Sequence, residues 1–126
     1  VFVLRLVPGM RADIIPLLAP HYRALVLESF GVGGLPGGEH GEMFAALRRW
    51  CESGRLAVFT TQVPHEGCDL AVYEVGRAVG ELPGVLEARD MTPEAVAVKL
   101  MWALCQTEDR EKAARLFETP IEYDIM

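Results

Sequence analysis

The chain has 126 residues, 51% of them hydrophobic and 24% charged, which is the composition of one globular domain and excludes a disordered chain. Its formal net charge of −6 argues against a nucleic-acid-binding surface, because such a surface needs clustered basic residues to displace counterions. Its three cysteines, with no CxxC motif and no histidine at ligand spacing, predict free thiols in the cytoplasm and no disulfide or zinc site.

No stretch of the sequence reaches the roughly 18 apolar residues that a membrane span requires, and no signal peptide is visible. The chain begins with Val1, inside a predicted strand and without an initiator methionine. We therefore expect residues 1–126 to form a single domain that is a piece of a longer protein.

Strand and helix patterns alternate along the sequence. Short β-branched or apolar runs bounded by turn residues predict strands over residues 1–7, 24–29, 55–61 and 84–88. Apolar residues at three- and four-residue intervals predict helices over residues 11–20, 41–54, 70–82, 91–105 and 107–117. This alternation is typical of an α/β fold with a parallel sheet of about four strands, flanked by helices.

Two of these elements carry more specific expectations. The strand at 1–7 is apolar on both faces, which predicts a central position in the sheet. The helix at 91–105 is apolar nearly all round, which predicts that it is largely buried, with Thr92 as its N-cap and Pro93 at its first position. Lys99 is the lone cation on that helix, and we expect its side chain to reach the surface.

Ligands of parallel sheets gather at the edge formed by the carboxyl ends of the strands. The second strand ends there in ESFGVGGLPGGEHGE (28–42), a glycine-rich segment that could cradle a phosphate. Gly31 and Gly33 match the start of a dinucleotide fingerprint, but Pro36 stands where the third glycine belongs. The helix also begins several residues later, and no Gly-Lys-Ser/Thr follows, so the sequence does not favour nucleotide binding.

Nucleophilic catalysis finds little support in the sequence. Ser29 lacks the G-x-S-x-G elbow, and although His65 and Asp69 could approach it from the next loop, nothing in the spacing requires this. Cys51 and Cys105 lie on predicted helix faces, as small core residues do. The remaining candidates are scattered over several segments: His21, His40, Cys68, Glu74, Glu81 and Glu87.

Two carboxylates end predicted strands at the functional edge. Glu28 closes the second strand and Asp90 follows the fourth, so either could hold a loop or the amine of a ligand. Asp90 could equally favour the start of the next helix through its charge. The residues alone thus predict an α/β domain with a polar rim and no active site of its own.

Three segments, taken together, identify a family. ALVLESFGVGGLP (24–36), TTQVPHEGCDLAVYEVGR (60–77) and RDMTPEAVAVKLMWAL (89–104) resemble, in order and spacing, the C-terminal domain of cytoplasmic type I bacterial L-asparaginases. The resemblance extends over residues 3–117. It implies a flavodoxin-like or Rossmann-like small domain. The matching enzymes hydrolyse L-asparagine to L-aspartate and ammonia with no metal and no other cofactor.

The resemblance also implies which domain of the enzyme carries the catalytic residues. In these enzymes a larger N-terminal domain carries the nucleophilic threonine and the Thr-Asp-Lys group that activates it, and no such motif occurs in this chain. We therefore expect no catalytic residue in this segment, and no activity from the chain alone. The implied partners are the enzyme's own N-terminal domain, further copies in a homodimer or homotetramer, and L-asparagine, with neither nucleic acid nor membrane.

The family's glycine loop suggests which residues shape the pocket rim. Its pattern is Glu/Arg-Ser/Thr-Phe/Tyr-Gly-x-Gly-Asn-x-Pro, and this sequence follows it except that Gly34 replaces the asparagine. Val63 also replaces a usual cysteine in the next loop. The missing asparagine at Gly34 disfavours a direct substrate contact from this loop. Val63, together with Glu28 where cooperative relatives often carry arginine, disfavours an effector site for asparagine. The candidate rim or effector residues are Glu28, Ser29, Gly31, Gly33, Gly34, Gln62, Asp69 and Tyr73.

Two other functions remain open at this point. The asparaginase-like subunit of archaeal-type glutamyl-tRNA(Gln) amidotransferase resembles the same domain. A non-catalytic module for small-ligand binding or dimerisation would also fit the composition.

Overall fold

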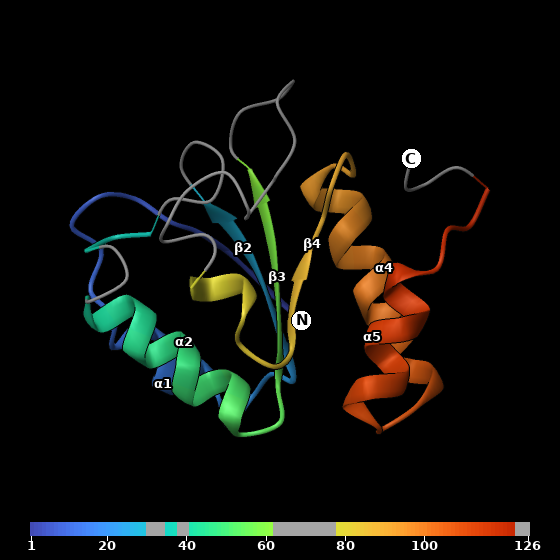
Figure 1. The fold of residues 1–126 in the computed structure, drawn as a ribbon, viewed down its shortest axis with the longest axis horizontal. Coiled ribbons are helices and arrows are strands. Elements are labelled where there is room, and N and C mark those ends of the chain that lie inside the picture. Colours follow the sequence, from blue (N-terminus) through green and yellow to red (C-terminus); the bar gives the residue numbers. More distant parts are fainter. Residues whose placement is uncertain (30–34, 38–40, 62–77, 123–126) are drawn as a thin grey trace.

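The computed structural model describes residues 1–29, 35–37, 41–61 and 78–122. Within these ranges the chain forms one parallel sheet with helices on both faces (Figure 1). The α/β class predicted from the alternating patterns is confirmed.

Four strands build the sheet: β1 (Phe2–Arg5), β2 (Ala24–Ser29), β3 (Leu56–Thr61) and β4 (Val85–Glu87). They lie in the order β1-β2-β3-β4, and each neighbouring pair is parallel. The register sets Val3 beside Val26, Val26 beside Val58, and Val58 beside Leu86. All four carboxyl ends therefore point to the same edge, as the sequence predicted.

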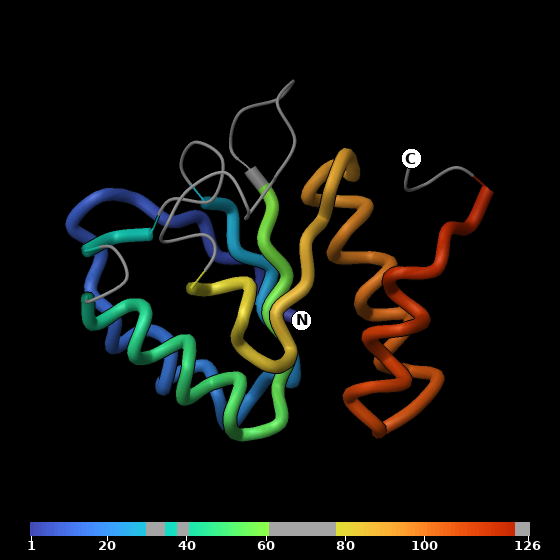
Figure 2. The backbone as a smooth tube through the Cα atoms, viewed as in Figure 1, coloured from blue at the N-terminus to red at the C-terminus, as the bar shows by residue number. Residues whose placement is uncertain are grey.

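The helices divide between the two faces of the sheet. α1 (Ile14–Leu18) and α2 (Glu42–Glu52) cover one face, and α4 (Pro93–Gln106) and α5 (Arg110–Glu118) cover the other (Figure 1). Figure 2 shows α4 and α5 side by side, joined by a short turn, away from α1 and α2. Residues 78–82 are the described part of the helix predicted over 70–82; residues 78–80 are helical, and the chain turns at residues 81 and 82.

This division follows from the strand order. Because the strands follow one another along the sheet and crossovers are right-handed, α1 and α2, which follow β1 and β2, lie on the same face. α4 and α5 come after the last strand, so they are free to cover the opposite face. Each face then buries its own apolar core.

The central strands β2 and β3 contribute alternate residues to the two cores. Leu25, Leu27 and Phe59 pack toward α1 and α2. Val26 and Val58 pack toward α4 and α5. Burial on both faces explains why these two strands are almost continuously apolar in sequence.

The prediction that the first strand is central was wrong. β1 lies at an edge of the sheet. Val3 on its second face and Val7, beyond the end of the strand, are exposed. An apolar run on both faces signals that both faces can be covered. α4 contacts β1 as well as β2 and β3, and Val1 packs against the second core, but at this edge the second face of β1 is covered only in part.

The helix predicted over 91–105 begins where the sequence predicted. Thr92 caps α4 by accepting a hydrogen bond from the Ala95 amide at 3.2 Å, and Pro93 occupies the first turn. The prediction that this helix is largely buried was wrong for half of its surface. Its inner face is buried in the second core, whereas the opposite face exposes three large side chains: Val98, Met101 and Trp102.

Candidate functional site

The carboxyl edge of the sheet brings together the predicted strand-end residues. β2 ends in Glu28 and Ser29, and the register places Glu28 between Arg5 of β1 and Thr60 of β3. Glu87 ends β4 on the far side of β3, beside Phe59. Parallel pairing thus gathers two carboxylates, a guanidinium-bearing residue and two hydroxyl-bearing residues along one edge.

Ser29 is fixed within this edge. Its side chain is 0% exposed, and its hydroxyl donates a hydrogen bond of 3.0 Å to the backbone carbonyl of Thr60. That carbonyl is its hydrogen-bond partner within the described residues, and no histidine or carboxylate there is positioned to take the hydroxyl proton. Ser29 therefore has a structural role, because its hydroxyl joins the carboxyl ends of β2 and β3. It is not activated as a nucleophile.

Of the other predicted rim residues, one lies within the described part of the chain. Glu28 is half-buried at the end of β2, directly before Ser29. The remaining candidates lie outside the described residues, so their roles stay predictions: Gly31, Gly33, Gly34, Gln62, Asp69 and Tyr73.

The turn after β4 leads from this edge into α4. The Met91 amide donates to the Ala88 carbonyl at 3.2 Å, and Arg89 within the turn has a φ of 56°, in the left-handed region. The N-cap of α4 is Thr92 and not Asp90, which lies two residues earlier in the exposed turn.

Neither of the two thiols in the described residues offers a nucleophile at this edge. Cys51 is completely buried in α2, where burial raises the pKa of its thiol to about 11, so the reactive thiolate is scarce at neutral pH. Cys105 lies exposed near the end of α4, on the other face of the sheet. His21 precedes β2 and lies toward the amino edge, as predicted, while His40, His65 and Cys68 fall outside the described residues.

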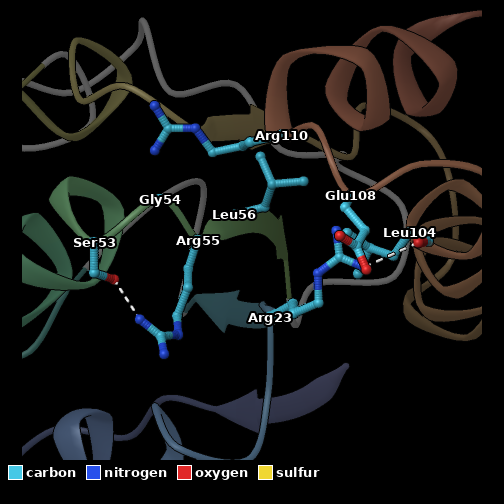
Figure 3. A pocket seen from close by; sticks show the side chains of 8 residues that line it. All are labelled: Arg23, Ser53, Gly54, Arg55, Leu56, Leu104, Glu108 and Arg110. Carbon is cyan, nitrogen blue, oxygen red and sulfur yellow. Dashed lines mark hydrogen bonds between the residues drawn. The ribbon is translucent and has the colours of Figure 1, made fainter.

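A pocket of about 220 Å³ lies at the opposite, amino edge of the sheet, and sequence reasoning missed it. Figure 3 shows its lining, to which three separate segments each contribute an arginine. The lining residues are Arg23, Ser53, Gly54, Arg55, Leu56, Leu104, Glu108 and Arg110. The sequence carries no local signal for this pocket, because arginines and partners lie as far as 84 residues apart.

Each arginine of this pocket binds the carboxyl end of a different helix. Arg55 donates to the carbonyls of Ala19 at 2.8 Å and Tyr22 at 3.2 Å, just beyond α1. Arg110 donates to the Cys51 carbonyl of α2 at 2.6 Å. The Cys51 carbonyl also accepts a hydrogen bond of 3.0 Å from the Gly54 amide. Carbonyls at the carboxyl end of a helix carry partial negative charge, so a guanidinium placed there stabilises the helix end.

Arg23 completes this set on α4. Its guanidinium donates to the carbonyls of Leu104 at 3.0 Å and Thr107 at 3.1 Å. In Figure 3 the three guanidinium groups point in different directions and do not meet at one point. The pocket thus joins three helix ends to the sheet, and its geometry does not form an anion-binding cradle.

Lys99 differs from its expected position at the surface. Its side chain is 7% exposed, and its ammonium donates to the Thr119 carbonyl at 2.7 Å. The same nitrogen lies 5.8 Å from the centre of the Phe117 ring, within the range of a cation–π contact. Lys99 therefore holds the end of α5 against α4, because α5 covers the flank along which the side chain would otherwise reach water.

Two further properties concern the described ranges only. There, no three histidine, cysteine or acidic side chains cluster closely enough to hold a metal ion. None of the helices in these ranges has the length and hydrophobicity that crossing a bilayer demands.

Comparison with known proteins identifies the relatives of this fold. The chain is 38% identical to an L-asparaginase of Thermococcus kodakarensis over 122 residues, or 97% of this chain and 36% of that protein. The solved structure of that thermostable L-asparaginase superposes with a TM-score of 0.89 at 36% identity, covering 99% of this chain and 37% of the other. L-asparaginase I of Vibrio cholerae superposes with a TM-score of 0.85 at 28% identity, covering 98% and 37%.

A protein named as part of an amidotransferase is almost as similar to this chain in sequence. A glutamyl-tRNA(Gln) amidotransferase polypeptide from Metallosphaera sedula is 36% identical over 120 residues, or 94% of this chain and 26% of that polypeptide. The chain thus spans about a third, or less, of the length of these relatives. Residues 1–117 match the model of the glutaminase/asparaginase C-terminal domain, and the chain therefore belongs to that family.

Proposed function

We propose that this chain is the C-terminal domain of an L-asparaginase, which hydrolyses L-asparagine to L-aspartate and ammonia in the cytoplasm. The observation that carries the proposal is the family match over residues 1–117, joined to the similarity to L-asparaginases along nearly the whole chain. The nucleophile belongs to an N-terminal domain of the complete enzyme. The chain by itself is inactive.

The carboxyl edge of the sheet supplies part of the substrate-pocket rim. Ser29 ties the carboxyl ends of β2 and β3 together through the Thr60 carbonyl. This bond fixes the points from which the segments 30–41 and 62–77 leave the sheet, and these segments contain the predicted rim residues. A rim built this way is held in place by buried strands instead of by the loops themselves.

Glu28 is the rim residue with a direct chemical role in this proposal. Its carboxylate ends β2, is half-buried, and lies beside Ser29 at the edge where the loops begin. A carboxylate in that position can accept charge-assisted hydrogen bonds from the protonated α-amine of an amino-acid substrate. The rim acts on a pocket whose reacting groups come from the N-terminal domain, of the same or a neighbouring subunit in a homodimer or homotetramer.

Ammonia release by the complete gene product tests this proposal. The purified full-length protein is expected to release ammonia from L-asparagine, and the isolated 126-residue chain is expected to release none above the uncatalysed background. The Glu28→Gln variant of the full-length protein should raise KM for L-asparagine several-fold with a smaller change in kcat. A correctly folded full-length protein without asparaginase activity would refute the proposal.

The similarity to the glutamyl-tRNA(Gln) amidotransferase polypeptide supports a second candidate. An asparaginase-like component of such an amidotransferase would deliver ammonia to a partner that modifies glutamyl-tRNA. It should therefore hydrolyse amides efficiently only when the partner and charged tRNA are present. Steady ammonia release by the purified protein without either of them decides for L-asparaginase.

A further inference from the structure

A groove of about 460 Å³ runs along the outer face of α4, and its lining is mostly apolar. Val98 is 66% exposed and Trp102 40%, although the opposite face of the same helix is buried in the core. Neighbouring exposed apolar side chains of this size mark an interaction surface. The residues that line the groove are Met91, Ala95, Val98, Lys99, Trp102 and Ile121.

The chain itself reaches this groove after α5. Ile121 is 46% exposed and forms the part of the lining that does not come from α4 or the turn before it. Glu122 follows with a φ of 46°, in the left-handed region, and the chain turns there. A side-chain-bearing residue in that conformation is unfavourable by itself and persists where surrounding contacts compensate. This turn allows the next residues to run back along α4.

The segment that follows has the length and composition to cover the groove. Residues 123–126 read Tyr-Asp-Ile-Met and lie outside the described part of the chain. Four extended residues span about 13 Å, and the seven-residue step from Ala95 to Trp102 along the helix rises about 10 Å. Three of the four side chains are large and mainly apolar, as the lining is.

The charges beside the groove also suit this segment. The Lys99 side chain is 7% exposed, and its ammonium binds the Thr119 carbonyl where the chain leaves α5. A carboxylate near such an ammonium adds a charge-assisted contact, and Asp124 would supply one. The acidic residues at the ends of the two helices are exposed, so water screens their repulsion of this carboxylate: Glu94, Glu108 and Glu118.

We propose that residues 123–126 fold back along α4 and occupy this groove, with Ile125 against Val98 and Trp102 and the Asp124 carboxylate beside the Lys99 ammonium. α4 is then covered on two faces by its own chain, as its apolar sequence predicts. The proposal does not rest on the asparaginase assignment. Its tests measure contacts and stability, and activity plays no part in them.

Magnetic resonance and fluorescence of the 126-residue chain test the contact. Nuclear Overhauser effects are expected between the Ile125 methyl protons and the Trp102 indole, at every protein concentration, because the contact lies within one chain. Trp50 is 3% exposed, so iodide quenches chiefly Trp102, and Ile125→Asp should increase this quenching. Missing Overhauser effects would overturn the proposal, and so would effects that vanish on dilution, which would indicate a second copy in the groove.

Urea unfolding measures what the segment contributes to stability. Ile125→Asp should raise the equilibrium constant of unfolding about tenfold, because a large apolar side chain loses its burial. Leu17→Asp is the matched control, since Leu17 is 68% exposed on α1, across the sheet, and should change the constant less than about threefold. Equal effects of the two variants would overturn the proposal and leave the groove to another protein.

A double-mutant cycle tests the placement of Asp124 beside Lys99. Asp124→Asn should raise the unfolding constant about fivefold in the unchanged chain and leave it unaltered in a Lys99→Met chain, where methionine keeps the apolar stem without the charge. Glu122→Gln is the control and should act equally in both chains. An Asp124→Asn effect of the same size in both chains would contradict the proposed position of the segment.

Discussion

Replacing Arg55 with methionine tests how strongly the helix ends are tied to the sheet. The Arg55 guanidinium makes three hydrogen bonds: to the carbonyls of Ala19 and Tyr22, and to the Ser53 hydroxyl at 2.7 Å. It also lies 5.4 Å from the centre of the Trp50 ring. Methionine keeps the apolar stem on that ring but removes the charge and every donor.

The size of the effect follows from these contacts. A hydrogen bond from a charged donor contributes about 1.5–3 kcal/mol, and a partly exposed cation–π contact about 0.5–1 kcal/mol. The two carbonyls are partly buried and can regain water once the side chain is shortened, which returns some of this energy. We therefore expect Arg55→Met to lower the free energy of unfolding by about 2–3 kcal/mol.

Urea unfolding followed by tryptophan fluorescence measures this loss, and the m-value should stay constant. Arg48→Met is the matched control, because Arg48 is exposed on α2 and makes no side-chain hydrogen bond within the described residues, so its effect should stay within about 0.5 kcal/mol. Arg55→Lys should fall between the two, since an ammonium cannot reproduce the fork of donors. Equal losses for Arg55→Met and Arg48→Met would refute the reasoning.

Three further predictions follow from single side chains. Thr92→Ala removes the cap of α4 and should cost about 1 kcal/mol in urea unfolding, whereas Thr92→Ser should cost much less; equal costs would contradict the capping role. Hydrogen bonds from the backbone amides of Lys112 and Glu111 lower the pKa of Asp109 below 3.8, so its stabilisation is present above that pH and is lost as the pH falls further. Asp109→Asn keeps the cap and should make the free energy of unfolding depend less on pH in the acidic range. An unchanged pH dependence would argue against Asp109 as its source. Iodoacetamide at pH 8 should label the exposed Cys105 in the native protein and leave Cys51 unlabelled until denaturant is added, as peptide mass spectrometry can check; rapid native labelling of Cys51 would contradict its burial.

Local chemistry made much of the fold predictable. β2 and β3 are apolar at almost every position because both of their faces are buried, and this gives a clear strand signal. The start of α4 follows from Thr92 and Pro93 alone, since a cap depends on neighbours three residues away. The position of Glu28 and Ser29 at one edge followed from the parallel topology.

The wrong predictions concern surfaces whose covering lies elsewhere. β1 and α4 carry apolar residues on two faces, but the described chain leaves the outer face of α4 exposed and covers the second face of β1 only in part. Sequence periodicity shows that a face is suited to burial, and it does not reveal what buries it.

The remaining surprises depend on contacts between distant residues. Whether Ser29 is free or bonded depends on its register with β3, and the Thr60 carbonyl lies 31 residues away. Arg23 meets the end of α4 across 81 and 84 residues, and no pattern in the sequence pairs them. Lys99 is buried only because α5 returns beside α4 and presents the Thr119 carbonyl.

A domain replacement tests whether this chain can serve as the C-terminal domain of an L-asparaginase. Residues 1–126 should take the place of the matched C-terminal segment in the L-asparaginase of Thermococcus kodakarensis, with which they share 38% identity. Ammonia release from L-asparagine is then compared between the chimera, the truncated enzyme without this segment and the 126-residue chain alone. We predict that the chimera regains activity while the other two remain inactive. A folded chimera that stays inactive, or hydrolysis by the chain alone, would contradict it.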